Sequence, residues 1–275
     1  MQQINQMIRI VSLLFSLVVV SSAHADAFMT LGVTKSTQLS GLLDYILPIF
    51  QTAANLKVQV ILVDPGQEVA MAERGDVDAM LFDDRPAEDK IVANGYGINR
   101  LDAMYDDFVI VGPSSDPAGI RGLNDARKAF AQIATKGALF ASRGDDSSTN
   151  RMELRLWKSA DVEPGKGAAW YRDVGQGMEA TLALAAAKNA YTLTDRATWA
   201  DFKNRQNLEI LTEGDPAWSN IYGTILANPA KRPLEKFTYA RIWHDWLTNH
   251  HGREAFTSYK INGEQIFFPP RQAAH

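Results

Sequence analysis

The 275-residue sequence contains no cysteine. This absence excludes disulfide bonds, thiolate metal sites, cysteine nucleophiles and a lipid anchor attached to a cleavage-site thiol. The sequence also lacks a Gly-x-Ser-x-Gly motif, the nucleophile turn of many hydrolases. The net charge is −4, without the basic stripe that nucleic-acid-binding proteins usually carry. We therefore expect no nucleic-acid partner.

The histidines show no metal-binding pattern. His244, His250 and His251 lie in a C-terminal segment with helical periodicity, and no acidic ligands are paired with them. We interpret these three side chains as a solvated helix end. Because no nucleophile–base pair is recognisable either, we expect a protein that is not an enzyme and has no metal or cofactor.

Charge is scarce at the N-terminus, where Arg9 is the only charged residue among the first 25. An apolar run follows Arg9 and ends at the small-residue tripeptide Ala23-His24-Ala25. This order predicts a cleavable signal peptide over residues 1–25, with a mature chain that starts near Asp26. The run is shorter than the ~20 apolar residues that a transmembrane helix needs. We expect a periplasmic protein.

Short segments rich in β-branched residues alternate with longer segments that have apolar residues at helical spacing. The expected strands cover residues 28–33, 57–63, 77–82, 107–111, 139–142, 170–174 and 222–227. The expected helices cover residues 39–50, 66–74, 86–94, 124–135, 150–160, 177–189, 195–204 and 237–248. This alternation predicts an α/β fold built from right-handed βαβ units around mostly parallel sheets.

A chain of this length often forms two lobes. The polar, proline-containing stretch 112–117 is the sharpest break, and we place the first crossing between lobes there. The apolar strand 222–227 is the expected return crossing. We predict two doubly wound lobes joined by two crossing segments, with lobe I formed by 26–112 and 218–275, and lobe II by 113–217.

Two polar turns lie where an expected strand passes into an expected helix. The N-terminus of a helix leaves N–H groups unpaired and carries a positive dipole end, so such a turn can bind an anion. The first turn, Thr34-Lys35-Ser36-Thr37, is better explained by ordinary helix capping when it is taken alone. The second, residues 142–149, combines Arg143 with two aspartates and several hydroxyls. A cap needs only one such residue, so this turn favours a binding site.

Two further turns carry less specific signals. The segment Gly175-Gln176-Gly177-Met178-Glu179-Ala180, with Asp195 further along, formally satisfies the dinucleotide-binding fingerprint. An exported location and a position deep in the second lobe argue against a nicotinamide cofactor. We interpret Gly177 as a point of close backbone approach at a cleft. In the turn over 192–196, Arg196 is either a cation that faces the cleft or part of an ordinary helix start.

Eight segments taken together resemble one family, the tungstate-binding proteins of tungstate ABC transporters, within the type II periplasmic binding proteins. The matching segments are residues 40–44, 75–79, 94–100, 107–113, 116–120, 142–147, 175–178 and 191–196. The resemblance implies a two-lobed fold that captures tungstate or molybdate between its lobes. It also implies delivery to an ABC permease in the inner membrane, and we expect a monomer.

The resemblance implies a cleft site with contributions from both lobes. The candidate ligand-binding residues are Thr34, Lys35, Ser36, Arg143, Ser147, Gly177 and Arg196. Of these, Thr34, Ser36 and Arg143 match the family's motifs directly.

Four positions depart from the family's motifs. Val33 and Lys35 replace hydroxyl residues, Ser148 replaces glycine, and Asp83 stands where the family often has histidine. Lys35 either pairs with Asp83 or faces the ligand. The departures leave a small anion as the expected ligand, with tungstate less firmly indicated than the anion class.

The orientation of the acids in the second turn bears on the ligand. Hydroxyls and N–H groups that only donate suit a fully deprotonated oxyanion, whereas a carboxylate in the shell requires a protonated ligand oxygen. Asp145 or Asp146 facing the ligand would favour a phosphate-like anion, and both turned away would favour tungstate or molybdate. The alternatives to an importer are a periplasmic sensor subunit and, less favoured, a hydrolase that uses one of these acids as a base.

Overall fold

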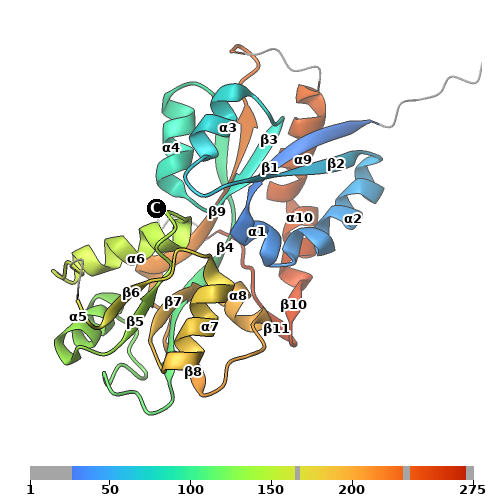
Figure 1. Cartoon of the computed structure of the whole chain (residues 1–275). Helices are drawn as coiled ribbons and strands as arrows, with labels where there is room; N and C mark the ends of the chain where they lie inside the picture. The colour runs from blue at the N-terminus through green and yellow to red at the C-terminus, as the bar shows by residue number, and fades with distance from the viewer. Residues whose placement is uncertain (1–26, 165–167, 232–235, 271–275) are drawn as a thin grey trace, which may run out of the picture.

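A computed structural model describes residues 27–164, 168–231 and 236–270, so the expected signal peptide lies outside the described residues. Figure 1 shows two halves stacked along the long axis of the molecule, with two strands running through both. Within these three ranges no helix has the length and apolar character needed to cross a membrane.

The described chain alternates strands and helices for most of its length. The strands are β1 (Phe28–Thr34), β2 (Lys57–Val63), β3 (Ala79–Phe82), β4 (Gly97–Pro113), β5 (Phe140–Ser142), β6 (Tyr171–Asp173), β7 (Thr192–Asp195), β8 (Leu208–Thr212), β9 (Ser219–Ala227), β10 (Lys260–Ile261) and β11 (Glu264–Gln265). The helices are α1 (Lys35–Leu39), α2 (Leu42–Ala54), α3 (Glu68–Arg74), α4 (Arg85–Ala93), α5 (Ala126–Lys136), α6 (Ser148–Ser159), α7 (Met178–Lys188), α8 (Arg196–Asp201), α9 (Phe237–Thr248) and α10 (His250–Ser258), and a 3-10 turn covers Pro216–Trp218.

One sheet extends through both halves, in the order β2-β1-β3-β9-β4-β7, and β8 also pairs with β4. In the half that we call lobe I, β1 pairs in parallel with β2 and β3, as βαβ units require. β9 returns antiparallel to β3. In lobe II, β5 pairs in parallel with β6. The α/β class and the two-lobed architecture are confirmed.

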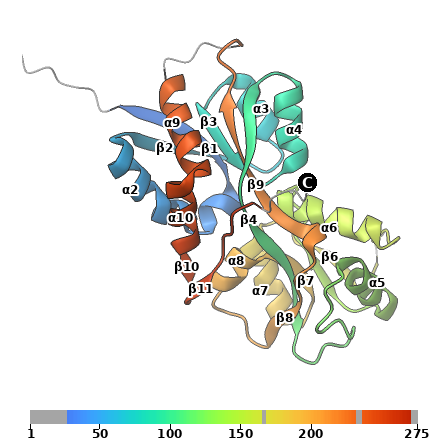
Figure 2. The same ribbon diagram turned by 180° about the vertical axis from the view of Figure 1, so that it is seen from behind.

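Each lobe has its own aromatic core. In lobe I, Phe50 of α2 packs edge-on against Trp243 of α9, with ring centroids 5.1 Å apart. In lobe II, Trp157 of α6 packs against Phe130 and Phe140 at 4.4 and 5.0 Å. Burial of such rings is a main source of folding free energy, so these clusters help to stabilise both lobes. Figure 2 shows α9 and α10 lying against lobe I on the face opposite to that of Figure 1.

Strands β4 and β9 form the crossings between lobes. β4 pairs with β9 from Gly97 to Asp107, and from Phe108 onward it pairs with β7. The change of partner falls inside β4, ahead of the stretch 112–117 where we expected the crossing. β4 is also much longer than the expected strand 107–111. Its register shifts after Ile98, and a positive φ at Asn99 interrupts the alternation that identifies a strand.

The C-terminal region contains a second helix, α10, that was not predicted as a separate element. α10 begins with His250-His251-Gly252, residues with poor helix propensity. A Cβ at Gly252 would lie 2.3 Å from the carbonyl oxygen of Trp246, so the glycine permits close packing of α10 against the end of α9. Tertiary packing, and not local helix propensity, therefore makes this segment helical.

Candidate functional site

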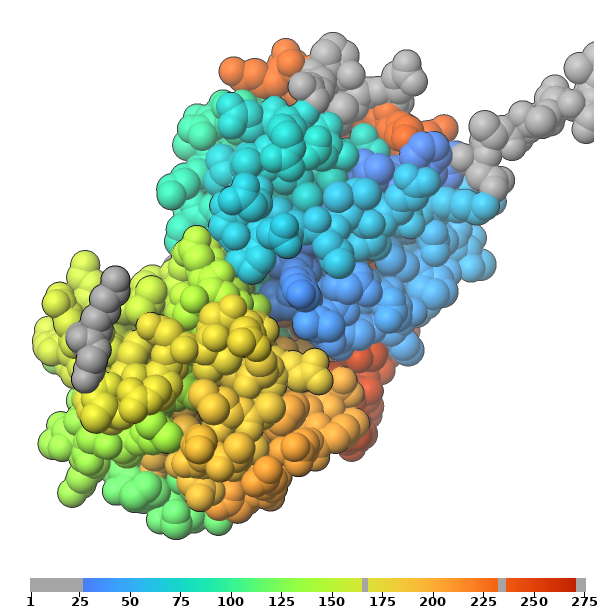
Figure 3. Space-filling view, viewed as in Figure 1, coloured from blue at the N-terminus to red at the C-terminus, as the bar shows by residue number. Residues whose placement is uncertain are grey.

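Two of the predicted turns meet between the lobes. One follows β1 in lobe I, and the other follows β5 in lobe II. They enclose a small pocket lined by Thr34, Lys35, Ser36, Val63, Pro65, Glu68, Arg143, Ser147 and Ser148. Its cavity volume is only about 10 Å³, so the two lobes touch across it. Figure 3 shows this contact on the surface, where the blue and teal atoms of lobe I meet the yellow-green atoms of lobe II.

The lobe I side of the pocket is a hydroxyl cluster. Thr34 caps α1, because its Oγ1 accepts a hydrogen bond from the Thr37 N–H at 3.3 Å. The Thr34 hydroxyl also lies 2.7 Å from that of Thr37 and 3.0 Å from that of Ser36. α1 has only 5 residues, so its dipole adds little to anion binding, and the side chains carry the chemistry of this turn.

Asp83 lies at the centre of this cluster, just after β3. Its carboxylate accepts hydrogen bonds from Thr34 at 2.8 Å, from Ser36 at 2.9 Å and from Ser148 at 2.8 Å. Ser148 belongs to lobe II, so the carboxylate bridges the two lobes. From the sequence, Asp83 was expected near this turn as a possible partner of Lys35. Its hydrogen bonds to the hydroxyls of Thr34, Ser36 and Ser148 were not predicted.

Lys35 lies beside Asp83 without pairing with it. Its side chain is exposed and lines the pocket. Across the described ranges no ion pair links Lys35 to Asp83, so the acid is balanced by hydroxyls and the ammonium group is left to solvent and the pocket. Of the two alternatives for Lys35, the geometry favours the one in which its ammonium group faces a ligand.

The lobe II side of the pocket is built around a buried arginine. Arg143 is only 6% exposed, and its Nε donates to Asp145 at 2.8 Å while its Nη1 approaches the Thr149 hydroxyl at 3.4 Å. Ser147 caps α6 by accepting from the Asn150 N–H at 3.2 Å, and the Ser147 N–H donates to Asp145 at 3.2 Å. Asp145 therefore bonds within its own turn and holds the guanidinium in place.

A buried glutamate supports this turn from below. Glu153 of α6 accepts hydrogen bonds from Ser142 at 2.8 Å, Trp157 at 3.0 Å and Tyr171 at 2.7 Å. Burial raises the pKa of Glu153 to about 7, although these hydrogen bonds lower it in part. Glu153 thereby ties the end of β5, where the Arg143 turn begins, to the helix that follows it.

A second interlobe contact flanks the pocket. Arg151 of α6 lies 2.5 Å from Asp84 and 3.4 Å from Glu68, which both belong to lobe I and are almost fully buried. Arg151 also pairs at 3.1 Å with Asp146, whose side chain is 71% exposed and is not among the residues that line the pocket. Burial raises the pKa of Glu68 and of Asp84, and Arg151 opposes the rise in both. The closed arrangement thus includes an ion-pair network.

Two of the predicted ligand-binding residues lie outside the small pocket. Gly177 precedes α7 with a φ of 86°, and Arg196 begins α8; neither is among the described residues that line the pocket. The Arg196 guanidinium donates to both oxygens of Asp107, at 2.6 and 2.7 Å, and to Glu213 at 2.6 Å. Because the partner of β4 changes at Asp107, Arg196 sits at the crossing between lobes.

The C-terminal histidines divide into two kinds. His250 and His251 are exposed, but His244 is buried and its Nε2 lies 2.7 Å from the Asn99 carbonyl oxygen. The interpretation as a solvated helix end was therefore wrong for His244, which packs inward from the middle of α9. Among the described residues no group of three or more histidines and acids could hold a metal ion.

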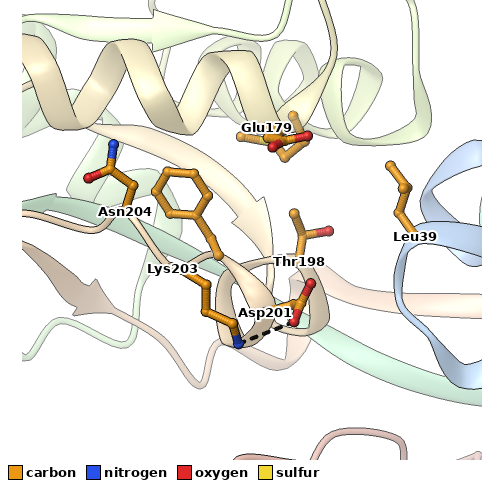
Figure 4. Close-up of a pocket in the computed structure, with 8 residues that line it drawn as sticks. Leu39, Glu179, Thr198, Asp201, Lys203 and Asn204 are labelled. Carbon is orange, nitrogen blue, oxygen red and sulfur yellow. Dashed lines mark ion pairs between the residues drawn. The ribbon is translucent and has the colours of Figure 1, made fainter.

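A larger hollow opens beside the small pocket, also between the lobes. Its volume is about 340 Å³, and it is lined by Leu39, Met178, Glu179, Thr198, Asp201, Phe202, Lys203 and Asn204. Figure 4 shows Leu39 of α1 on one side of this hollow and the lobe II residues Lys203 and Asn204 on the other. Lys203 is the one basic residue among the described residues that line this hollow, and it is exposed and paired with Asp201 at 3.3 Å. The small pocket is the better anion site.

Two α/β lobes, two crossing strands and a polar site between the lobes define a type II periplasmic binding protein. Comparison with known proteins agrees: the model of the PBP superfamily domain matches residues 20–250. The solved tungstate-binding protein TupA of Desulfovibrio alaskensis is 36% identical, with a TM-score of 0.81 over 90% of this chain and 100% of that one. A solved protein of the tungstate ABC transporter of Geobacter sulfurreducens is 45% identical, with a TM-score of 0.76 over 84% of this chain and 98% of that one.

A sequence relative gives the same result. The tungstate-binding protein TupA of Peptoclostridium acidaminophilum is 35% identical over 91% of this chain and 88% of its own length. The chain belongs to the PBP superfamily and, within it, to the TupA family.

Proposed function

We propose that the chain is the solute-binding component of an ABC importer and captures a tetrahedral oxyanion between its lobes. The relatives are named for tungstate, and molybdate has the same shape and charge. The observation that carries the proposal is the buried Arg143, which lines the same pocket as the hydroxyls of Thr34, Ser36 and Ser148. A buried cation among hydroxyl groups from two lobes suits an anion better than any neutral ligand.

Arg143 supplies the main recognition element. Its guanidinium is planar and is held in position by Asp145 and Thr149, so its remaining N–H groups are directed without a further entropic cost. α6 begins at Ser148 beside it and has 12 residues, which gives its N-terminus a full helix dipole. The proposed ligand-binding residues in the pocket are Thr34, Lys35, Ser36, Arg143 and Ser147; contact by Gly177 or Arg196 stays a prediction.

Capture requires the lobes to separate and close again. A cavity of about 10 Å³ has room for about one water-sized probe, so a larger anion enters only when the lobes move apart. β4 and β9 are the two crossings about which such a hinge motion can occur. Small-angle scattering should show a smaller radius of gyration with saturating ligand. An unchanged radius would contradict a site shared between lobes.

The remaining parts of the proposal concern where the protein acts. We expect export by the signal peptide over residues 1–25, a monomer in the periplasm, and delivery of the anion to an inner-membrane permease. Delivery to a membrane receptor by a sensor subunit is the alternative. A hydrolytic role is disfavoured because Asp145, a possible base, is engaged by Arg143 and by the Ser147 N–H.

A thermal-shift panel tests the function directly. Tungstate, molybdate, sulfate, phosphate and arsenate should each be compared with small organic acids. A ligand at 1,000 times its dissociation constant stabilises the native state by ~4 kcal/mol, which corresponds to a rise in Tm of roughly 10 °C for a chain of this size. Stabilisation by none of the oxyanions would contradict the proposal.

A further inference from the structure

We propose that the Asp106 carboxyl group, buried where β4 crosses between the lobes, takes up a proton from solution when the lobes close on the anion and releases it when they open. Asp106 is not among the residues that line the small pocket, so it acts on capture as a positioning residue and not as a ligand. The inference rests on the proposed function, because it concerns closure of the same cleft. It adds a proton to the equilibrium by which the anion is captured.

The first observation is that the Asp106 carboxyl group is removed from water without gaining a partner. The residue is 0% exposed, and neither carboxyl oxygen accepts a hydrogen bond from the residues that the structure describes. Asn220 lies opposite Asp106 in the ladder between β4 and β9, but its side-chain amide donates to the Tyr222 hydroxyl at 3.2 Å. An ionised carboxylate in such a place loses its hydration without compensation, whereas a neutral carboxylic acid loses much less. The arrangement in the closed form therefore favours the protonated group.

The second observation is that Asp106 lies between acids of both lobes. Burial raises the pKa of Asp106 well above its ordinary value, and the Asn220 amide opposes the rise. The charge of Asp195, which ends β7 in lobe II, and that of Asp83, which follows β3 in lobe I, add to the rise, as does the adjacent Asp107. Because acids from the two lobes act on Asp106 together, it lies at the floor of the cleft between them.

The cations on the neighbouring elements are engaged with other acids. Arg196 of α8 pairs with Asp107 and with Glu213, and Arg143 is held within its own turn. Burial raises the pKa of Asp195, and Arg143 lowers it, which places the floor near the cation of the proposed anion site. Across the three described ranges, no group of three or more histidines and acids could hold a metal ion. A proton is therefore the cation that relieves the buried charge at this position.

Movement of the lobes changes how strongly Asp106 binds its proton. β4 and β9, which run beside each other at Asp106, are the crossings about which the lobes move, so opening admits water to the floor of the cleft. Water returns the pKa of Asp106 toward its ordinary value of 3.8. At a pH between the open and closed values, closure takes up a proton. The contribution to closure is complete below the open-form pKa and is lost as pH rises through the closed-form pKa.

Isothermal titration calorimetry with sodium tungstate counts this proton. When binding is measured at one pH in buffers of different ionisation enthalpy, the slope of the observed enthalpy gives the number of protons taken up. Wild-type protein should show net uptake, and its Kd should rise by up to about tenfold per pH unit between about pH 6 and about pH 9. Asp106→Asn keeps the shape of the side chain and is neutral at every pH. It should lose the uptake, and its Kd should change by less than about threefold over the same range.

Glu88→Gln is the matched control. Glu88 of α4 is also fully buried, and burial raises its pKa to about 7, with Arg100 opposing the rise. The two side chains pair at 2.7 Å inside lobe I, so their surroundings do not change when the lobes close. Glu88→Gln should therefore keep the proton uptake and the pH dependence of wild-type protein. Circular dichroism would establish that both variants fold.

The possible outcomes separate the two proposals. Absence of proton uptake by wild-type protein over this range would overturn the inference without the need for a variant. So would an uptake that Asp106→Asn retains, or one that Glu88→Gln loses equally. In each of these cases tungstate still binds, and the proposed function stands. Failure of wild-type protein to bind any of the oxyanions of the thermal-shift panel at any pH would contradict the proposed function and the inference with it.

Discussion

The two sides of the pocket are built differently. In lobe II, Arg143 is 6% exposed and is fixed by two partners, and the helix after its turn has 12 residues. In lobe I, Lys35 is exposed and the helix after its turn has 5 residues. Lobe II therefore presents a site that is assembled in advance, and lobe I presents groups that are completed by closure. An anion should bind to the lobe II side first, because fewer side chains have to be immobilised there on binding.

The acids of the two sides differ in the same way. Asp145 of lobe II orients a cation, so it strengthens anion binding indirectly. Asp83 of lobe I accepts hydrogen bonds from the hydroxyls of Thr34 and Ser36, so it orders hydroxyl groups rather than a cation. Asp145 thus supports the cation of lobe II, and Asp83 supports the hydroxyls of lobe I. The predictions below test how much each side contributes to anion binding.

The largest effect is expected at Arg143. Arg143→Ala removes the one buried cation among the described residues that line the pocket, and hydrogen bonds to charged partners are worth ~1.5–3 kcal/mol. Affinity for the preferred oxyanion should fall by about one to two orders of magnitude in calorimetric titration. Arg143→Lys should restore only part of it, because a point charge lacks the planar fork. Wild-type affinity in Arg143→Ala would remove the turn over 142–149 from the site.

A smaller effect is expected at Arg151, which holds the lobes together without lining the pocket. Arg151→Ala leaves Glu68 and Asp84 buried without their cation, which disfavours the closed form. Affinity should fall by about three- to tenfold for phosphate and tungstate alike, and scattering should show less compaction with ligand. Arg127→Ala is the control, because its pair with Asp161 is exposed and lies within lobe II. A loss confined to one anion would mean that Arg151 selects as well as closes.

More of the lobe II side of the pocket than of the lobe I side could be predicted from the sequence. Arg143, Asp145 and Ser147 lie in one turn, so their proximity follows from the chain itself. The partnership of Thr34 with Asp83 joins the ends of β1 and β3, which are neighbours only once the parallel sheet exists. Contacts between distant segments depend on register, which periodicity does not specify.

The fold shows the same limit. Helix 237–248 was predicted with the bounds of α9, because its apolar spacing is regular. The first ten residues of β4 were missed because an irregular register masks their alternation, and α10 because packing overrides its poor propensity. The sequence could not show that Arg196 forms ion pairs instead of facing the cleft. Its partners, Asp107 of β4 and Glu213 just after β8, lie far from it along the chain.

The buried acid of lobe II gives a prediction on stability. The pKa of Glu153 is about 7 in the folded chain, against an ordinary value of 4.5. Between these values the folded state holds the proton and the unfolded state does not, so stability falls as pH rises through this window. Glu153→Gln should flatten the fall in Tm between about pH 5 and pH 7 by a few degrees. Glu179→Gln, an exposed control, should leave the slope as in wild type.

The smallest effect is expected at Lys35, and it tests the lobe I side alone. Lys35 lines the pocket, is exposed and has no ion-pair partner within the described ranges, so its attraction to the ligand is screened by salt. Lys35→Thr should weaken binding by about two- to threefold in low salt and by less in high salt, which flattens the salt dependence of the dissociation constant. Lys188→Thr, which removes an exposed charge from the end of α7, controls for net charge alone. An equal loss at every salt concentration would mean that Lys35 contributes a fixed hydrogen bond, and lobe I would then share in setting affinity.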